Sequence, residues 1–400
     1  MKVDMETAVT RQEGAALLLE RWTPRPKTEY VPLAEALGRV TAVDLYSENT
    51  LPVCRVSACD GIAVRSADFE HGIPDPSDWV KGVQFVCADT GDDFPDEYDS
   101  IIAVEEIYYD EQGRLHFRRE FPFVTGDGVR AAGSMLKKGD LLVRANTRIT
   151  PELTVALATG GIAFVPVLVR PKVAFLPTGT ELIPAGLCPE RGQNIETNSL
   201  LLSGLLKGWG AEPICFPITK DDRARLSARL DEALALADIV IINGGSSRGE
   251  EDFNCRLLEE RGEFFRHGVR AVPGRPVGMS IIEGKPVLNL PGPVLAAWLA
   301  ADWLLQRLVC HYYGLPMPKR QQVAGILTVD IKKPPHFEML HWVRMERSGE
   351  DYLITPIPRG SDAAFAMREA SGLLTIPIGC TGYAKGDRVT VELLKGEELI

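Results

Sequence analysis

The sequence predicts a multidomain protein that combines an α/β domain, built on a mostly parallel sheet, with β-rich segments. Between residues 170 and 314, strand-like apolar runs alternate with helix-like stretches, as in a parallel sheet with helices on its faces. On both sides of this region, short apolar runs are separated by Gly, Pro and Asp clusters, which is typical of small β modules. A chain of 400 residues has room for roughly two to four domains.

The part of the chain before residue 170 predicts three helices and several short strands. Apolar spacing favours a helix over residues 8–21 and a short helix over 33–37 that leads into a strand. Residues 150–163 predict a further helix, with Thr150 as N-cap, Pro151 in the first turn and glycine at its end. Four apolar runs in between predict strands, namely 83–86, 101–104, 115–117 and 141–143.

The α/β region is predicted to alternate regularly between strands and helices. The strands are expected over residues 173–176, 214–218, 239–242, 277–282 and 287–290. The helices are expected over residues 198–207, 222–236, 252–261 and 294–309. The polar stretch 317–322 indicates a linker, and residues 323–400 return to short β-type runs such as 389–394.

The composition argues against several classes of protein. With 44 basic and 55 acidic residues the formal net charge is −11, whereas nucleic-acid binding needs a basic face. The first residues lack a signal-peptide pattern, and the longest uncharged apolar stretch, 154–169, is shorter than the ~20 residues of a spanning helix. The eight cysteines form no CxxC pair and indicate reduced thiols in a cytoplasmic protein. The six scattered histidines argue against a zinc site.

Four loops beside predicted strands carry residues that fit an anion-binding cleft. They are 177–181 (PTGTE), 243–252 (NGGSSRGEED), 273–276 (PGRP) and 291–293 (PGP). Ligands of open α/β folds bind at the carboxyl edge of the sheet, glycines let backbone N–H groups approach an anion, and Arg248 and Arg275 supply positive charge. Together the loops predict a cleft for a phosphate-bearing small molecule. Taken singly, 178–181 and 247–250 also fit helix capping boxes, and Arg275 fits a solvated turn.

The β-rich module before residue 143 has two further features. Asp60 precedes Gly61 and an apolar run, an arrangement that local sequence favours as a hairpin turn. Residues 89–106 form a concentrated acidic patch that includes Asp99 and Glu105. Such a patch is usually a solvated loop, and the alternative is a site for a hard cation such as Mg²⁺, which presents itself to phosphate or oxyanion oxygens.

Taken in order along the chain, these motifs resemble the molybdopterin molybdenumtransferase family, the molybdenum-insertion enzymes that include bacterial MoeA and the gephyrin E domain. The likeness covers nearly the whole chain, and it depends on the order and spacing of the motifs together. The motifs are the turn at 57–61, the pair 90–91, and the segments 178–182, 192–198, 244–252, 273–276, 290–293 and 370–377.

The resemblance implies four domains and a homodimer. Residues 1–44 and 142–170 would form an elongated dimerisation domain, and 45–141 an inserted β-rich domain. Residues 171–318 would form an α/β molybdopterin-binding domain, and 319–400 a C-terminal β-barrel. The cleft would join the α/β domain to β-rich material across the homodimer.

The resemblance also implies a reaction, namely insertion of molybdate into adenylylated molybdopterin with Mg²⁺-dependent release of AMP. We assign catalysis to Asp60, Thr90, Glu181 and Asp252, with Asp60, Glu181 and Asp252 also as Mg²⁺ ligands. The pterin and its phosphate are assigned to Thr178, Gly179, Gly244, Gly245, Ser246, Ser247, Arg248, Gly249, Pro273, Gly274, Arg275, Pro291, Gly292 and Pro293. Molybdate and the adenylylated pterin are both anions, which the carboxylates of an acidic cleft would repel. The cleft therefore needs a cation such as Mg²⁺ between the carboxylates and the two reactants.

The chain departs from the family pattern at several positions beside this cleft. Ser134 stands where an acidic residue is usual, the segment 290–293 lacks an Asn, and Val272 and Arg275 replace lysines. These departures make a non-catalytic molybdopterin-binding paralogue or scaffold the alternative function. A nucleotidyltransferase that uses the α/β domain alone is a third reading, less favoured because the flanking β modules match the insertion family. Expected partners are a second copy, the pterin, the oxyanion and other molybdenum-cofactor assembly proteins, with neither nucleic acid nor membrane.

Overall fold

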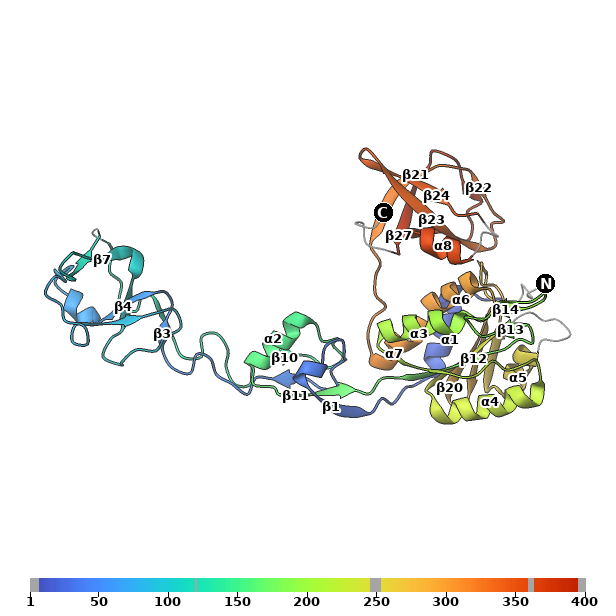
Figure 1. Cartoon of the computed structure of the whole chain (residues 1–400), viewed down its shortest axis with the longest axis horizontal. Coiled ribbons are helices and arrows are strands. Elements are labelled where there is room, and N and C mark those ends of the chain that lie inside the picture. Colours follow the sequence, from blue (N-terminus) through green and yellow to red (C-terminus); the bar gives the residue numbers. More distant parts are fainter. Residues whose placement is uncertain (1–6, 119–120, 245–252, 359–362, 395–400) are drawn as a thin grey trace. The chain divides into compact units, whose positions relative to one another are not determined.

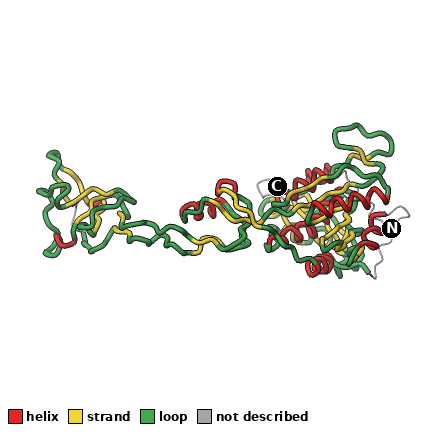
Figure 2. The backbone as a smooth tube through the Cα atoms, turned by 90° about the horizontal axis from the view of Figure 1, so that it is seen from below, coloured by secondary structure: helices red, strands yellow, loops and turns green. Residues whose placement is uncertain are grey.

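The structure is a computed structural model that describes residues 7–118, 121–244, 253–358 and 363–394 (Figure 1). The chain divides into two compact units: unit 1 comprises residues 1–27 and 168–400, and unit 2 comprises residues 28–167. Most of the helices belong to unit 1, which carries both chain ends, while unit 2 consists mainly of short strands and loops (Figure 2). Within the described ranges no helix has both the length and the apolar character needed to cross a membrane.

Unit 1 contains a six-stranded sheet whose order is β15-β12-β16-β20-β19-β17. Its strands are β12 (Lys172–Pro177), β15 (Glu212–Cys215), β16 (Ile239–Asn243), β17 (Phe264–His267), β19 (Gly278–Ile282) and β20 (Lys285–Leu290). The first four strands in this order are parallel, and β19 and β17 are antiparallel. The central strands are buried on both faces, as near-continuous apolar runs predict. The expected mostly parallel sheet is therefore confirmed.

Helices cover both faces of this sheet (Figure 1). They are α1 (Arg11–Arg21), α3 (Asn198–Trp209), α4 (Arg223–Leu236), α5 (Phe253–Arg261), α6 (Val294–Ala300) and α7 (Gln306–Tyr313). The pair α4 and α5 packs on one face, while α1, α3 and α6 pack on the other. A π-helical segment, Ala301–Leu305, joins α6 to α7. The loops after the parallel strands are left at the carboxyl edge, where ligands of such folds bind.

The C-terminal part of unit 1 is a closed barrel. Its elements are β21 (Gln322–Leu327), β22 (Ile331–Lys332), β23 (Glu338–Ser348), β24 (Asp351–Pro356), α8 (Ala363–Glu369), β25 (Gly372–Ile376), β26 (Gly382–Tyr383) and β27 (Arg388–Leu393). Five strands close in the order β23-β24-β21-β27-β25, with β25 pairing back to β23. The short strand β18 (Ala271–Val272) of the α/β part pairs with β23 and ties the barrel to it. The predicted C-terminal barrel is confirmed.

Unit 2 has separate hydrophobic cores for its two parts. Its strands are β1 (Thr28–Pro32), β2 (Leu45–Tyr46), β3 (Val56–Ser57), β4 (Gly61–Val64), β5 (Phe85–Ala88), β6 (Ser100–Ala103), β7 (Ile107–Tyr109), β8 (Leu115–Phe117), β9 (Val129–Arg130), β10 (Leu141–Val143) and β11 (Phe164–Leu168), and its α-helix is α2 (Pro151–Thr159). One core lies around Leu157 and Val165, between α2, β2, β10 and β11. The others surround the three-stranded sheet β5-β4-β6 and include Ile62 and Tyr98.

Local signals set most element limits, with two instructive exceptions. Thr150 caps α2 by accepting the backbone N–H of Leu153, as the sequence predicts. The helix expected at 33–37 is only a 3₁₀ turn, because Gly38 takes a left-handed conformation (φ +74°) that ends it. The strand expected at 214–218 is observed at Glu212–Cys215, and it ends before Pro217, which has no N–H to donate to the sheet. The edge strands β11 and β17 were not predicted.

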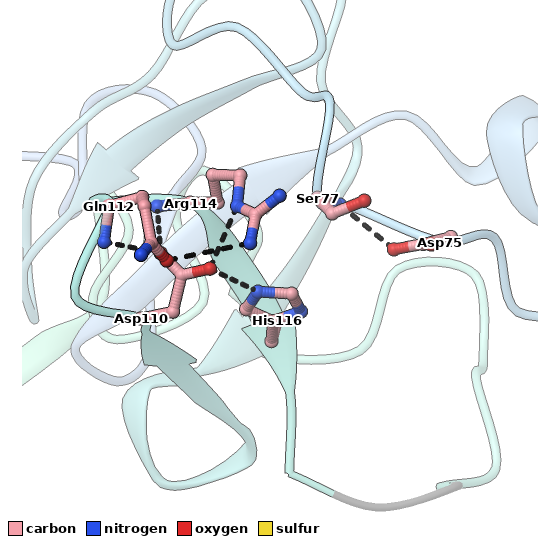
Figure 3. Close-up of polar contacts among 6 residues, drawn as sticks. All are labelled: Asp75, Ser77, Asp110, Gln112, Arg114 and His116. Carbon is pink, nitrogen blue, oxygen red and sulfur yellow. Dashed lines mark hydrogen bonds and ion pairs between the residues drawn. The ribbon is translucent and has the colours of Figure 1, made fainter.

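A charged cluster in unit 2 organises the β7–β8 hairpin (Figure 3). Asp110 Oδ1 accepts the backbone N–H groups of Gln112 and Arg114, both at 2.9 Å. Its Oδ2 accepts Arg114 Nε at 2.8 Å and lies 3.0 Å from His116 Nε2. These bonds, the backbone N–H of Arg114 foremost, hold the pKa of Asp110 well below its ordinary value. The cluster is thus a turn-forming network.

Replacing Asp110 with Asn is expected to loosen this hairpin at neutral pH. A carboxyl whose folded-state pKa is lowered stabilises the fold above its unfolded pKa of about 3.9, and that contribution is lost as the pH falls. Hydrogen exchange at the Gln112 and Arg114 amides should therefore be faster in Asp110→Asn at pH 7, with a difference that narrows below about pH 4. The neighbouring exposed variant Glu111→Gln is the control. Equal protection in Asp110→Asn and the wild type at pH 7 would contradict this role.

Candidate functional site

The ends of three parallel strands are joined by backbone hydrogen bonds in unit 1. The N–H of Thr178, which follows β12, donates to Asn243 O at 2.9 Å. The N–H of Gly244, which follows β16, donates to Leu290 O at the end of β20, at 3.1 Å. Three of the four predicted loops, 177–181, 243–244 and 291–293, therefore meet at the carboxyl edge of the sheet.

A buried network of amide side chains fixes these loops in place. Asn243 Nδ2 donates to Pro291 O at 2.8 Å, and its Oδ1 accepts Asn198 Nδ2 at 2.8 Å. Asn198 Nδ2 also donates to Gly292 O at 2.8 Å. Asn254 Nδ2, from α5, donates to Gly244 O at 2.8 Å. Because these groups are buried and hydrogen-bonded, breaking one leaves its partners unsatisfied, so the loops are held firmly.

A pocket of about 370 Å³ opens between these loops. Its lining comprises Thr178, Glu181, Leu182, 194–198, Asn243, Gly244 and 292–294. Two carboxylates belong to it, the exposed Glu181 and the buried Glu196. Glu196 accepts the N–H of Ser199 at 2.9 Å and also its hydroxyl, whereas the Glu181 carboxylate has no hydrogen-bond partner among the described residues. The pocket therefore has one carboxylate fixed by the protein and one available to a ligand.

Gly244 is required by the close approach of two loops. Its φ is +119°, which L side chains rarely adopt, and a Cβ added there would lie 2.4 Å from Thr178 O. A Cβ on Gly292 would lie 4.0 Å from Gly244 Cα, so the two glycine loops face each other. The Gly244 N–H is used by Leu290 O, so this glycine supplies space and not a free donor.

The described lining of the pocket has no basic side chain, so the donors that it offers to an anion come from backbone groups. The helices α3 and α6 begin at its lining, with Thr197 and Pro293 as N-caps that make no side-chain capping bond. In α3 the Glu196 carboxylate already accepts one first-turn N–H group, that of Ser199. Helix starts leave N–H groups unpaired and carry partial positive charge. The Gly292 N–H has no acceptor among the described residues. An anionic group in the pocket would find these donors.

A second, largely apolar pocket of about 600 Å³ adjoins the first. It shares Leu182 and Glu196 with it, and is walled by Leu200 and Phe216. Gly179 belongs to this second lining, and a Cβ there would meet the Glu181 carboxylate at 2.7 Å. The two pockets together combine a polar end with an apolar one, the usual character of a small-molecule site.

The loop 273–276 lies beside the first pocket and not in its lining. A Cβ on Gly274 would lie 3.8 Å from Ala296 O in the first turn of α6, and Pro273 follows a cis peptide bond. Arg275 lies over the Phe337 ring, with Cζ 4.7 Å from the ring centroid. Its Nε is buried without a hydrogen-bond partner, so the arginine is partly desolvated. The solvated-turn interpretation of Arg275 does not describe this packing.

In unit 2, Asp60 and Thr90 are in direct contact. Asp60 Oδ1 accepts the Thr90 backbone N–H at 2.6 Å and the Thr90 hydroxyl at 2.7 Å. These bonds, the backbone one foremost, lower the pKa of Asp60, so its carboxylate is ionised at neutral pH. Its Oδ2 has no hydrogen-bond partner among the described residues. The adjoining strand β4 pairs with β5 and β6 and not with β3, so Asp60 is not the tip of a β3–β4 hairpin.

Two carboxylates of the acidic patch that contains Thr90 stabilise local structure. Asp99 accepts the N–H and hydroxyl of Ser66 at 2.8 and 2.6 Å, and Asp92 accepts the N–H of Asp89 at 3.3 Å. Within the part of the chain that the structure describes, no three His, Cys, Asp or Glu side chains are grouped so as to hold a metal ion. A cation at Asp60 would therefore need oxygen ligands from elsewhere, such as substrate phosphates.

Six predicted site residues lie outside the described ranges, namely Gly245, Ser246, Ser247, Arg248, Gly249 and Asp252. The capping-box alternative for 178–181 is wrong, because no helix follows it and Thr178 is buried with its hydroxyl donating to Asn243 O at 3.1 Å. Pro291 contributes its carbonyl to the amide network, and Gly292 and Pro293 line the pocket.

Three pocket residues, Glu196, Asn198 and Asn243, were not predicted as site residues. Asn243 had a signal, since it ends an otherwise apolar strand, Ile-Val-Ile-Ile-Asn, where a buried polar side chain needs partners. Glu196 and Asn198 belong to the motif at 192–198, which has no local pattern that predicts a ligand. They reach the pocket because α3 begins there.

Three family models together match most of the chain. Residues 4–161 match the model described as "MoeA N-terminal region (domain I and II)", and residues 324–394 match "MoeA C-terminal region (domain IV)". Residues 174–311, which carry the pocket, match the model described as "Probable molybdopterin binding domain".

Individual relatives agree over nearly the full chain. A molybdopterin molybdenumtransferase of Haemophilus influenzae is 29% identical over 352 residues, covering 85% of this chain and 83% of the relative. One of Bacillus subtilis is 27% identical over 390 residues, covering 93% and 91%. The crystal structure of a molybdopterin biosynthesis MoeA protein from Pyrococcus horikoshii has a TM-score of 0.80 at 28% identity, covering 97% of this chain and 100% of that chain.

Proposed function

The chain belongs to the MoeA family of molybdopterin molybdenumtransferases, and we propose that it inserts molybdate into adenylylated molybdopterin with release of AMP. It is an enzyme of molybdenum cofactor biosynthesis that handles molybdopterin and molybdate. In the reaction water attacks the phosphoanhydride bond of the adenylylated pterin, so that AMP leaves and the pterin keeps its own phosphate. The two dithiolene sulfurs replace oxygen ligands of molybdate, which leave as water, and the oxidation state of molybdenum does not change. The observation that carries the proposal is the pocket between the Gly244 and Gly292 loops, within the molybdopterin-binding match.

We assign the anionic tail of the pterin to this pocket. The N–H of Gly292, which has no acceptor among the described residues, and the starts of α3 and α6 attract negative charge there. Arg275 on the adjacent loop supports the same charge, and Ser246, Ser247 and Arg248 are expected to add donors. The adjoining apolar pocket offers a wall for the planar pterin ring at Phe216 and Leu200.

Asp60 and Glu181 each have a carboxylate oxygen without a hydrogen-bond partner among the described residues, and we propose that they and Asp252 hold Mg²⁺. Oxygen ligands suit this hard cation, which takes one or two carboxylates together with substrate phosphates. Asp60 fits, because Thr90 orients its carboxylate and lowers its pKa further, while its Oδ2 is unpartnered among the described residues. When bound, Mg²⁺ would offset the charge that develops on the anhydride oxygens. Thr90 orients the carboxylate, so its effect on the reaction passes through Asp60.

The biological unit in this proposal is a cytoplasmic homodimer. In it, residues 1–44 and 142–170 would form the dimerisation domain and 45–141 the β-rich domain. Residues 171–318 would form the molybdopterin-binding domain and 319–400 the barrel, and the cleft would join the α/β domain of one subunit to β-rich material of the other. The family likeness supports this arrangement. Other molybdenum-cofactor assembly proteins are the expected protein partners, and no nucleic acid is involved, in keeping with the net charge of −11.

A reconstituted assay tests the function. The purified protein is incubated with adenylylated molybdopterin, Mg²⁺ and either molybdate or tungstate, and AMP is measured. AMP release that depends on the oxyanion is expected. Tight molybdopterin binding without AMP release would indicate a scaffold, and pyrophosphate release from ATP and molybdopterin would indicate an adenylating enzyme.

A further inference from the structure

A separate pocket of about 340 Å³ in unit 1 is walled by three arginines, Arg11, Arg270 and Arg307, and is called the arginine pocket below. Glu338 is the acidic residue on its lining, and Trp303 provides an apolar wall. None of these residues lines the pocket at Gly244. Three arginines against one glutamate form a local positive surface on a chain whose net charge is −11.

The frame of the arginine pocket is fixed by backbone hydrogen bonds between three segments. Arg270 N donates to Val9 O at 2.8 Å, next to the start of α1. Glu338 N, at the start of β23, donates to Arg270 O at 2.8 Å. The pocket therefore does not depend on long side chains to hold its shape, and its charged groups project from a preorganised backbone.

Among the residues that the structure describes, Arg11 alone of the three arginines has a carboxylate within hydrogen-bond distance. Arg11 forms a bidentate pair with Glu338, with Nε to Oε2 at 2.5 Å and Nη2 to Oε1 at 2.9 Å. Arg270 approaches the half-exposed Glu13 only to 3.7 Å. Arg307, on α7, makes no hydrogen bond or ion pair with any other described residue. The pocket thus retains positive charge after its internal pairs are formed.

Arg270 and Arg307, which have no carboxylate within hydrogen-bond distance among the described residues, are also partly desolvated. The Nε atoms of Arg270 and Arg307 are buried and have no hydrogen-bond partner among the described residues. Burying one guanidinium nitrogen without a hydrogen-bond acceptor costs free energy. An anion bound at the remaining N–H groups of the guanidinium would offset this cost. Two such groups face one pocket from different elements, α7 and the segment before β18.

The start of α1 adds donors to the same pocket. Thr10 and Glu13 form a capping box that uses the N–H groups of Glu13 and Thr10. The capping box leaves the N–H groups of Arg11 and Gln12, in the first turn of this eleven-residue helix, without a partner in the helix. Thr10, Arg11 and Gln12 all belong to the lining.

We propose that the arginine pocket binds an oxyanion of the phosphate class, either inorganic phosphate or the phosphate group of a small phosphomonoester. Arginine forks bind tetrahedral oxyanions through paired N–H groups, which a point-charge lysine does not reproduce. No lysine lines the pocket. The remaining wall, formed by Trp303, Pro377 and Ile378, leaves apolar room beside the anion for a small organic group. This site is additional to the one that holds the pterin.

Calorimetric titration of the full chain at constant ionic strength tests the proposal, with inorganic phosphate and phenyl phosphate as probes. Saturable binding to one site per chain is expected, weakened about tenfold or more by Arg307→Gln. Arg307→Lys keeps the charge and loses the fork, so an intermediate affinity is expected. Tighter binding of phenyl phosphate than of phosphate would assign the site to phosphomonoesters, and equal binding would assign it to the free oxyanion.

Two control variants separate this site from the rest of the molecule. Arg229→Gln removes an exposed arginine of α4, and no change is expected. Arg275→Gln tests whether the probe occupies the proposed pterin site instead, and binding should persist. The proposal is overturned if neither probe binds saturably, if Arg307→Gln binds like the wild type, or if Arg275→Gln abolishes binding. Failure of AMP release would not affect this result, so the two proposals fail separately.

Discussion

Asp60→Asn is expected to lower the rate of molybdenum insertion at least about one hundredfold, while the dissociation constant for molybdopterin stays within about twofold. Asn keeps the size of the side chain and removes its charge. The carboxylate is held by the Thr90 backbone and hydroxyl, which lower the pKa of Asp60, and its Oδ2 is unpartnered among the described residues. Its loss should therefore affect the metal-assisted step and leave the pterin pocket in unit 1 unchanged.

Single-turnover AMP release and equilibrium binding of molybdopterin measure the two effects separately. Thr90→Val removes the 2.7 Å hydroxyl bond and keeps the backbone one, so a smaller loss of rate is expected. Asp93→Asn, an exposed carboxylate of the same acidic patch, is the control and should insert molybdenum at the wild-type rate. Unchanged insertion by Asp60→Asn would remove its catalytic assignment.

Gly244→Ala is expected to weaken molybdopterin binding about one hundredfold, because a displacement of about 1 Å in a binding loop has effects of that size. The added Cβ would lie 2.4 Å from Thr178 O, and this backbone cannot move without breaking the bond between Thr178 N and Asn243 O. The Asn254 bond to Gly244 O would shift with it. The strain therefore falls on the loops that form the pocket.

Gly284→Ala is the matched control for this variant. Gly284 also has a positive φ, +70°, but no atom lies within 4 Å of an added Cβ. It occupies the turn between β19 and β20, away from the lining of the pocket. Destabilisation of about 1–2 kcal/mol from the backbone conformation is expected, with molybdopterin affinity retained. If both alanine variants bound equally well, the close packing of Gly244 on Thr178 would not be needed for the site.

The fold was largely predictable because its signals are local. Alternating apolar strands and helices predict the α/β sheet, and the Thr150-Pro151 pair predicts the start of α2. The loops after β12, β16 and β20 were predicted to meet, because parallel strands present their carboxyl ends at one edge. Where a prediction failed, as at 33–37, one glycine with a left-handed conformation ended the helix.

The site was less predictable because its buried partners come from distant segments. Asn198, Asn243 and Gly292 are joined by two hydrogen bonds across 94 residues, and no local pattern encodes such a network. Asp60 was chosen through a family motif, while its local sequence favoured a hairpin turn that the structure does not contain. Thr90, which gives the Asp60 carboxylate its orientation, lies thirty residues further along the chain.

The arginine pocket had no sequence signal at all. The three arginines stand in unrelated stretches: Arg11 begins α1, Arg270 precedes the short strand β18, and Arg307 lies in the first turn of α7. Each is an ordinary surface residue by its neighbours in sequence. Only the packing of α1 and α7 beside the barrel strand β23 brings them around one space.

The most direct test of the central claim is a single-turnover measurement that counts AMP released and molybdenum bound to the pterin in the same sample. We predict equal amounts of the two, both dependent on Mg²⁺ and on molybdate. AMP released without molybdenum transfer, or molybdopterin that stays bound and adenylylated in the presence of Mg²⁺ and molybdate, would contradict the assignment.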